Sequence, residues 1–165
     1  MFEKGAHIFY ENSGVCRVED ITTLSGMGTG DRLYYCLSPV GQDGGKIYCP
    51  VDSDKVVMRP ILTREEALHL IDEMPSIDLL WVPNEKQRKE TYRQAIAGCN
   101  YQGWVSIIKT LYLRGKMRNQ DGKKITVVDK QFLNLAKQCL YGELSAALEI
   151  PVEEIEPMIL KRLGN

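Results

Sequence analysis

The sequence predicts an α+β protein of two domains, a small N-terminal β-barrel and a C-terminal bundle of about five α-helices. Over the first 60 residues, short apolar or alternating runs are separated by glycine-rich turns, which is typical of short strands. After Pro60 the apolar residues recur three and four positions apart, which is typical of amphipathic helices. This change of period predicts a boundary near residue 62, and therefore domains of residues 1–62 and 63–165.

Five short strands account for the N-terminal domain. Their apolar or alternating runs are residues 6–10, 16–18, 33–37, 47–51 and 56–58, and the main turns are expected at residues 12–14, 25–31 and 41–45. Gly26, Gly28 and Gly30 lead into a strand and not into a helix N-terminus, so they indicate a hairpin loop instead of a phosphate cradle. Strands this short, joined by tight turns, favour a closed or nearly closed barrel.

Capping residues predict where the C-terminal helices begin. The expected caps are Thr63, Asn84, Asn100 and Thr126, and Pro151 is expected in the first turn of a short last helix that Pro157 interrupts. Thr63 with Glu66 forms a capping box, in which each side chain can bond the other residue's amide. Trp104 lies on the apolar stripe of the third helix, which predicts that it is buried in the core.

The composition excludes several classes of protein. With 44% hydrophobic and 26% charged residues, the chain is typical of globular proteins and not of disordered or fibrous ones. It has no apolar run of the roughly 18 residues that a membrane span needs, and its N-terminus lacks the apolar segment of a secretion signal. These features predict a soluble, cytoplasmic protein without a membrane contact.

Few residues are available for catalysis or for holding a metal. The five cysteines are far apart, and only two histidines are present, so we expect reduced, packed thiols, no metal site and no cofactor. The glutamates in the C-terminal part have no partner set for acid–base chemistry and predict a solvated face: Glu143, Glu153, Glu154 and Glu156. An enzyme with a small-molecule substrate is therefore the weakest functional hypothesis.

One segment is strongly basic although the chain is nearly neutral. Residues 84–124 carry ten basic and three acidic side chains, a local charge of +7 in a chain of net charge −1. Lys86, Lys89 and Arg93 share one helix face, and a second cluster surrounds a loop near residue 120. The candidate DNA-contacting residues are Trp81, Lys86, Arg88, Lys89, Arg93, Lys116, Arg118, Lys123 and Lys124. An ordinary solvated helix surface is the alternative interpretation.

Trp81 precedes the cap of the second helix and allows two interpretations. In the first, it is a hydrophobic staple that seals the first and second helices. In the second, it is an exposed aromatic side chain beside basic residues, able to wedge against an opened base step.

Two aromatic strands indicate a protein-binding surface on the barrel. Strand alternation sends Tyr34 and Tyr35 to opposite faces, so we expect one of them to be exposed. The candidate partner-binding residues are Tyr34, Tyr35, Leu37, Tyr48, Cys49 and Pro50. A filled barrel with tyrosines that reach the solvent only at their hydroxyl groups is the alternative.

The order of these motifs resembles the CarD/CdnL family of bacterial transcription regulators. The similar segments are residues 1–10, 14–21, 34–37 and 47–51, then Arg88, Ala97-Gly98, residues 107–112 and residues 140–144. The family opening has Asp where this chain has Ala6. Counted back from Ala97-Gly98, Glu85 lies where the family typically has a tryptophan, and Trp81 is four residues earlier.

The resemblance implies an SH3/Tudor-like N-terminal module that binds the β subunit of bacterial RNA polymerase, a module shared with the transcription-repair coupling factor. It also implies a helical domain that contacts promoter DNA without sequence specificity, near the melted region, and a tryptophan that wedges into the minor groove to stabilise the open complex. On this basis the candidate partner-binding residues become polymerase-binding residues. The competing hypothesis is a protein-interaction adaptor that does not contact DNA.

Overall fold

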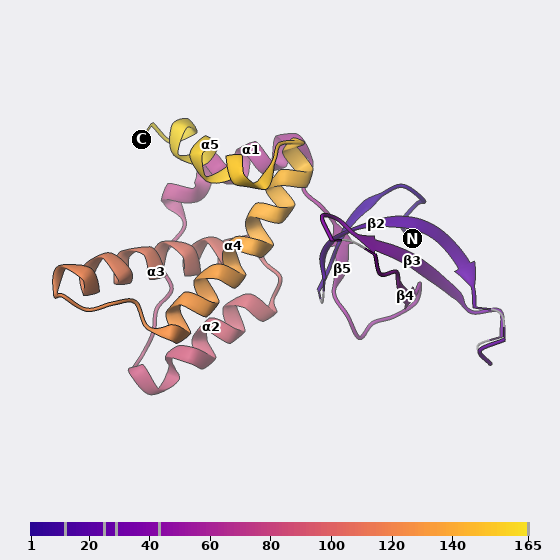
Figure 1. Cartoon of the computed structure of the whole chain (residues 1–165), viewed down its shortest axis with the longest axis horizontal. Coiled ribbons are helices and arrows are strands. Elements are labelled where there is room, and N and C mark those ends of the chain that lie inside the picture. The colour runs from indigo at the N-terminus through magenta and orange to yellow at the C-terminus, as the bar shows by residue number, and fades with distance from the viewer. Residues whose placement is uncertain (12, 25, 29, 43, 165) are drawn as a thin grey trace. The chain divides into compact units, whose positions relative to one another are not determined.

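The computed structural model describes residues 1–11, 13–24, 26–28, 30–42 and 44–164. These residues divide into two compact units, Met1–Thr63 and Arg64–Asn165. Strands make up the first unit and helices the second (Figure 1), so the α+β prediction is confirmed. The predicted turns include four residues that lie outside the described ones: Asn12, Ser25, Thr29 and Asp43.

The described part of the N-terminal unit forms one antiparallel sheet of five strands in the order β4-β3-β2-β1-β5. The strands are β1 (His7–Tyr10), β2 (Gly14–Thr23), β3 (Leu33–Pro39), β4 (Ile47–Pro50) and β5 (Met58–Pro60). Tyr10 faces Gly14 at the end of the β1–β2 hairpin, where Gly14 has a φ of +74° that favours glycine. Four strands thus follow the predicted runs, with β2 much longer than expected, while β5 shares only Met58 with the run predicted at residues 56–58.

The closed barrel that the sequence predicts is not formed. Among the described residues, β4 pairs with β3 and β5 pairs with β1, and the two outer strands do not pair with each other. A barrel closes only when its end strands share a ladder, and β4 and β5 have four and three residues. A bulge between Val18 and Asp20 in β2 increases the local twist without closing the sheet. The Tudor-like topology stays a prediction.

The core of the N-terminal unit lies on one face of this sheet. It includes Ile8, Val18, Tyr35 and Leu37, all of which are buried. The Tyr35 hydroxyl accepts a hydrogen bond from the backbone N–H of Phe2 at 2.9 Å, which satisfies its polar end. Tyr34 is only 9% exposed and Tyr35 2%, so the expectation that one of them is exposed is wrong. β3 is an inner strand, and the Arg32 guanidinium lies 6.0 Å from the Tyr34 ring centre.

The described residues of the C-terminal unit contain five α-helices and three short 3-10 helices. The α-helices are α1 (Arg64–Glu73), α2 (Arg88–Ala97), α3 (Tyr101–Gln120), α4 (Val127–Leu148) and α5 (Ile155–Arg162), and the 3-10 helices are η1 (Met74–Ser76), η2 (Glu85–Gln87) and η3 (Val152–Glu154). Three caps form as predicted, because side-chain oxygens of Asn84, Asn100 and Thr126 accept backbone N–H bonds. Pro157 lies in the first turn of α5, where a proline removes no helical hydrogen bond, so it does not interrupt that helix.

Helices α2, α3 and α4 share an apolar core. It includes Tyr92 from α2, Ile107 and Leu111 from α3, and Ala136 from α4. Trp104 is fully buried, as predicted. Gly103 permits the close approach of α2 and α3, because a Cβ atom there would lie 2.6 Å from the carbonyl oxygen of Ala95. In the part of the chain that the structure describes, no helix is long and apolar enough to cross a membrane.

Candidate functional site

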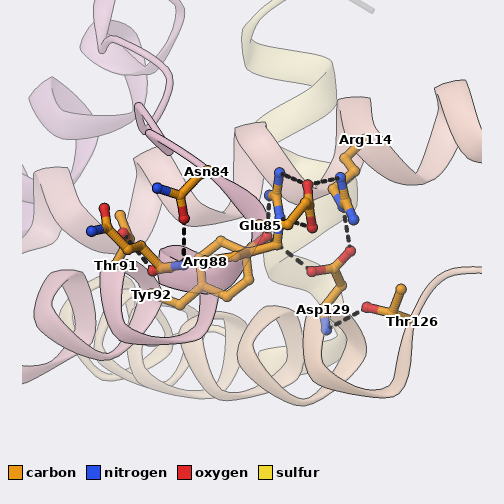
Figure 2. A network of polar contacts seen from close by, with 9 residues as sticks. Asn84, Glu85, Arg88, Thr91, Tyr92, Arg114, Thr126 and Asp129 are labelled. Carbon is orange, nitrogen blue, oxygen red and sulfur yellow. Dashed lines mark hydrogen bonds and ion pairs between the residues drawn. The ribbon is translucent and has the colours of Figure 1, made fainter.

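A buried carboxylate joins three helices of the C-terminal unit. Asp129, in the first turn of α4, is fully buried, and its backbone N–H donates to the Thr126 hydroxyl at 3.1 Å. Its carboxylate accepts the Tyr92 hydroxyl of α2 at 2.9 Å and Nε of Arg114 of α3 at 2.7 Å (Figure 2). The two partners together compensate the charge that burial removes from water.

Glu85 closes this network at the start of α2. Its carboxylate accepts Nη2 and Nε of Arg88 at 2.8 and 3.1 Å, and it lies 3.5 Å from Nη1 of Arg114. Arg88 in turn donates to the Tyr92 hydroxyl at 2.7 Å, so the five side chains form a ring (Figure 2). The guanidinium of Arg88 lowers the pKa of Glu85, and Glu85 in return raises the pKa of Arg88. Burial raises the pKa of Tyr92 and keeps its hydroxyl protonated.

The three arginines of the predicted DNA-contacting set are engaged within the chain. The side chain of Arg88 is 17% exposed and belongs to the ring. Arg93 pairs with Glu90 at 2.7 Å on the surface of α2. Nε of Arg118 donates to the carbonyl oxygen of Lys124 at 2.9 Å and holds the loop after α3. These contacts position elements of the unit and leave the arginines less available to phosphates than the sequence suggests.

The five lysines of the predicted set are exposed and form no ion pair among the described residues: Lys86, Lys89, Lys116, Lys123 and Lys124. Glu85 lies between arginines from both clusters and pairs with Arg88 beside the first. It also lies near Arg114 and within the electrostatic reach of Arg118 in the second. The positive charge available to a polyanion is therefore carried by lysines.

Trp81 is 79% exposed, so the staple interpretation is wrong. It lies in the segment between η1 and η2, where its neighbours Leu80 and Val82 pack against the core of the helical unit. The Leu80 N–H donates to the Thr110 hydroxyl at 2.8 Å and fixes the segment on α3. Leu80 and Val82, on either side of Trp81, are therefore anchored to the core while the indole itself lies in the solvent.

On the N-terminal sheet, the structure separates the six candidate polymerase-binding residues. Tyr34, Tyr35, Leu37 and Cys49 are buried, so their side chains are not available to a partner as the sequence led us to expect. Tyr48 is 47% exposed and Pro50 is half-buried, and both lie on β4, an outer strand of the sheet. Residues 34–37 of β3 are all buried, so both faces of that strand are covered, and the strand order that leaves β4 outermost is not visible from the sequence.

Two further predictions concern glutamates and cysteines, residue types that can take part in catalysis or bind a metal. The solvated face expected for Glu143 is wrong, because Glu143 is fully buried and accepts the Tyr101 hydroxyl at 2.6 Å. All five cysteines are free and four are buried, as predicted. Burial raises the pKa of the Cys16 thiol to about 11, which keeps it unreactive at neutral pH. The described residues contain no group of three or more histidine, cysteine, aspartate or glutamate side chains arranged to hold a metal.

Comparison with protein families decides the character of the N-terminal unit. Residues 2–62 match the CarD-like/TRCF RID domain. The N-terminal unit is a CarD-like RID domain. Over the N-terminal unit the match confirms the resemblance drawn from the sequence, and it indicates a transcription-related protein that interacts with RNA polymerase. The RID domain is a protein-interaction module and not an enzyme family. No curated protein matches the chain.

Proposed function

We propose that this protein is a non-enzymatic, cytoplasmic transcription regulator. Its RID domain binds the β subunit of bacterial RNA polymerase, and its helical unit contacts promoter DNA beside the melted region and stabilises the open complex. The observation that carries this proposal is the RID match over residues 2–62. The exposed lysines and Trp81 of the helical unit support the part that concerns DNA.

Strand β4 is the proposed docking edge for the polymerase. An outer strand has backbone N–H and C=O groups available for a strand of the partner, so the contact can form by strand addition. Tyr48, exposed on this strand, adds apolar area and a hydroxyl group to the contact. Pro50 lies at the end of β4 and limits how far such pairing can extend, because proline has no N–H.

The five exposed lysines are the proposed contacts to the DNA backbone. Phosphate contacts of this kind position a protein and do not read the sequence, so we expect little base preference in duplex DNA. The net charge of −1 keeps long-range attraction to DNA small, and we expect weak binding until the polymerase holds the protein in place. Trp81 then acts where the strands are already separating.

Binding to purified polymerase tests the role of the RID domain. We expect Tyr48→Ala to weaken binding of the full chain to the isolated β subunit about tenfold, because an interface aromatic residue is commonly a hot spot. Tyr112→Ala is the matched control, since Tyr112 is exposed on α3 of the other unit. Unchanged affinity of Tyr48→Ala, or an equal loss in the control, would contradict docking through β4.

The lifetime of the promoter open complex tests the role of the helical unit. Lys86→Glu with Lys89→Glu should shorten the lifetime while affinity for the β subunit stays unchanged. Lys130→Glu with Lys161→Glu is the control, because both lysines are exposed on other helices. If both double variants leave the lifetime unchanged while polymerase binding persists, the protein is an adaptor that does not contact DNA.

A further inference from the structure

A cleft of about 380 Å³ lies between helices of the C-terminal unit. Its inner wall is formed by buried apolar side chains from four elements: Met74 of η1, Val105 of α3, Leu140 of α4 and Ile159 of α5. None of the residues that line it belongs to the surfaces proposed above for the polymerase or for DNA. Binding sites for small molecules are commonly about 300–1,000 Å³ in volume and mostly apolar. The cleft therefore has the size and the character of a small-ligand site.

The mouth of the cleft is apolar as well. Tyr112 of α3 and Leu160 of α5 line the cleft and are 65% and 49% exposed. Val105, Ile108 and Tyr112 recur three and four positions apart, so they form one stripe on α3 that leads from the inner wall to the mouth. Apolar side chains that remain exposed around a cleft offer surface that a ligand with an apolar part can cover.

One wall of the cleft contains a cation without a carboxylate partner. The ammonium group of Lys109 donates to the backbone carbonyl oxygens of Met74 at 3.0 Å, of Pro75 at 3.3 Å and of Ile77. These acceptors carry no charge, and Lys109 forms no ion pair within the part of the chain that the structure describes. The charge is half-buried, so an anion beside it gains more than it would in open water.

The other polar groups of the cleft can bind the head of a ligand. Nζ of Lys137 and the hydroxyl of Tyr141 each lie 3.3 Å from Oε1 of Glu156. Both distances are long for bonds to a carboxylate, and the ammonium group of Lys137 has further N–H donors. Burial raises the pKa of Tyr141, so its hydroxyl stays protonated and able to donate. With Lys109 and Lys137 against Glu156, the lining has a net charge of +1.

We propose that this cleft binds an anionic amphiphile, a carboxylate with an unbranched apolar chain of about ten carbons. Its chain lies along the apolar walls, and Lys137 binds its carboxylate. At about 30 Å³ for each group of the size of a water molecule, the cleft holds about a dozen such groups, which matches a chain of that length with its carboxylate. The positive lining favours an anion over an amine of the same length. The site goes beyond the proposed function, because it requires neither DNA nor polymerase.

Isothermal titration calorimetry of the full chain at pH 7 tests the proposal with three probes, namely decanoate, octanoate and decylamine. We expect decanoate to bind at one site and below the concentration at which it forms micelles. Octanoate should bind about 15-fold more weakly, because each buried methylene contributes about fourfold in affinity. Decylamine should bind at least about tenfold more weakly than decanoate, because its charge has the same sign as the lining. Equal affinity for decanoate and decylamine, or no saturable binding of decanoate, overturns the proposal.

Charges placed at the mouth locate the ligand. Tyr112→Glu with Leu160→Glu should weaken decanoate binding at least about tenfold, because it removes apolar surface and introduces two negative charges. Leu113→Glu with Leu135→Glu is the matched control, since both leucines are exposed on α3 and α4 and neither lines the cleft. Unchanged affinity in the first variant, or an equal loss in the control, shows that decanoate binds elsewhere and overturns the assignment.

A second variant tests the contact to the carboxylate. Lys137→Gln should weaken decanoate binding about tenfold and reduce its advantage over decylamine, because the lining becomes neutral. Lys130→Gln is the control, since Lys130 is exposed on the same helix and does not line the cleft. The melting temperature of each variant checks that the helical unit is folded. An unchanged preference for decanoate in Lys137→Gln overturns the role of this lysine.

A segment of another protein is the competing occupant of the cleft. If decanoate does not bind while Tyr112→Glu with Leu160→Glu weakens binding to the polymerase holoenzyme, the cleft is a protein contact and the ligand proposal fails. The β-subunit and open-complex measurements of the proposed function contain no amphiphile. Either proposal can therefore fail while the other stands.

Discussion

Arg88 and Arg114 have a role opposite to that of the five exposed lysines of residues 84–124, although both groups contribute to the same local charge of +7. Arg88 and Arg114 point into the unit, where Glu85 and Asp129 bind them. Five of the six lysines remain exposed and form no ion pair among the described residues, whereas Lys109 is half-buried and donates to the backbone carbonyl oxygens of Met74 and Pro75. The difference shows that a charge count gives the number of cations and not the number available to a ligand.

The chemistry of the two side chains explains this division. A guanidinium is planar, weakly hydrated and able to donate several hydrogen bonds, so it is suited to a partly buried carboxylate. Arg88 donates to Glu85 and to Tyr92 at the same time, which one ammonium group on a flexible chain achieves less well. A lysine ammonium is strongly hydrated and remains in water, where a mobile phosphate can reach it.

The largest effect on stability is expected for Asp129→Ala. It leaves the half-buried guanidinium of Arg114 and the buried hydroxyl of Tyr92 without their shared acceptor. Removing one partner of a buried ion pair typically destabilises by about 3–5 kcal/mol. Urea unfolding followed by tryptophan fluorescence measures this change in the helical unit, which contains both tryptophans. Asp121→Ala is the exposed control, and an equal loss there would contradict a special role for Asp129.

A smaller loss is expected for Tyr92→Phe, which keeps the ring and removes only the hydroxyl group. The hydroxyl donates to Asp129 and accepts from Arg88, so its removal breaks two links of the ring in Figure 2. A hydrogen bond to a charged group contributes about 1.5–3 kcal/mol. The double variant with Asp129→Ala should lose less than the sum of the single losses, because both act on one network. Additive losses in the same unfolding assay would show that the two residues act independently.

The sequence predicts the local structure well because the signals for it are local. Caps at Asn84, Asn100 and Thr126 act on amides two or three residues away, and each forms in the structure. Strand alternation likewise predicts the burial of Ile8, Tyr10, Cys16 and Val18, although Phe9 and Val15 are buried as well. The α+β class follows from the two-residue period of the strands and the three- and four-residue spacing of apolar residues in the helices.

What the sequence does not predict depends on contacts between distant residues. Closure of the barrel depends on whether β4 and β5 pair with each other. Both strands are so short that the pattern of apolar residues in the sequence does not show where they begin and end. Asp129 has the spacing of a capping partner for Thr126, yet its carboxylate binds Tyr92, which is 37 residues away in the sequence. Trp81 is exposed because Leu80 is bonded to Thr110, 30 residues later. Contacts between residues so far apart leave no pattern that can be recognised in a single sequence.

Because the exposed lysines contact nothing within the chain, we expect their substitution to change DNA binding and to leave stability almost unchanged. Each phosphate contact contributes about −0.9 to the slope of log K against log salt, so five lysines give at most about −4.5. Lys86→Gln with Lys89→Gln should reduce the magnitude of this slope by about 1.8. Its unfolding free energy should stay within about 0.5 kcal/mol of that of the unchanged protein, as is usual for surface substitutions. A salt titration in which Lys130→Gln with Lys161→Gln changes the slope equally would contradict this assignment.

A small effect on stability is expected for Glu85→Gln, which tests the acidic residue that lies between Arg88 and Arg114. Arg88 lowers the pKa of Glu85 in the folded state, so ionised Glu85 stabilises the fold above its unfolded pKa of about 4.3. This stabilisation is lost as the pH falls through the lower folded pKa. The melting temperatures of Glu85→Gln and of the unchanged protein should therefore differ slightly at pH 7 and converge at low pH. The side chain of Glu85 is 69% exposed, and water weakens its ion pairs, which keeps the difference small.

Glu85→Gln should strengthen DNA binding, because the substitution removes a negative charge and frees Arg88 and Arg114 for phosphates. Tighter DNA binding at pH 7 with nearly unchanged stability would show that Glu85 restrains the arginines. Weaker DNA binding would instead show that the ion pairs between Glu85 and the arginines keep the lysine-bearing helices in position for DNA.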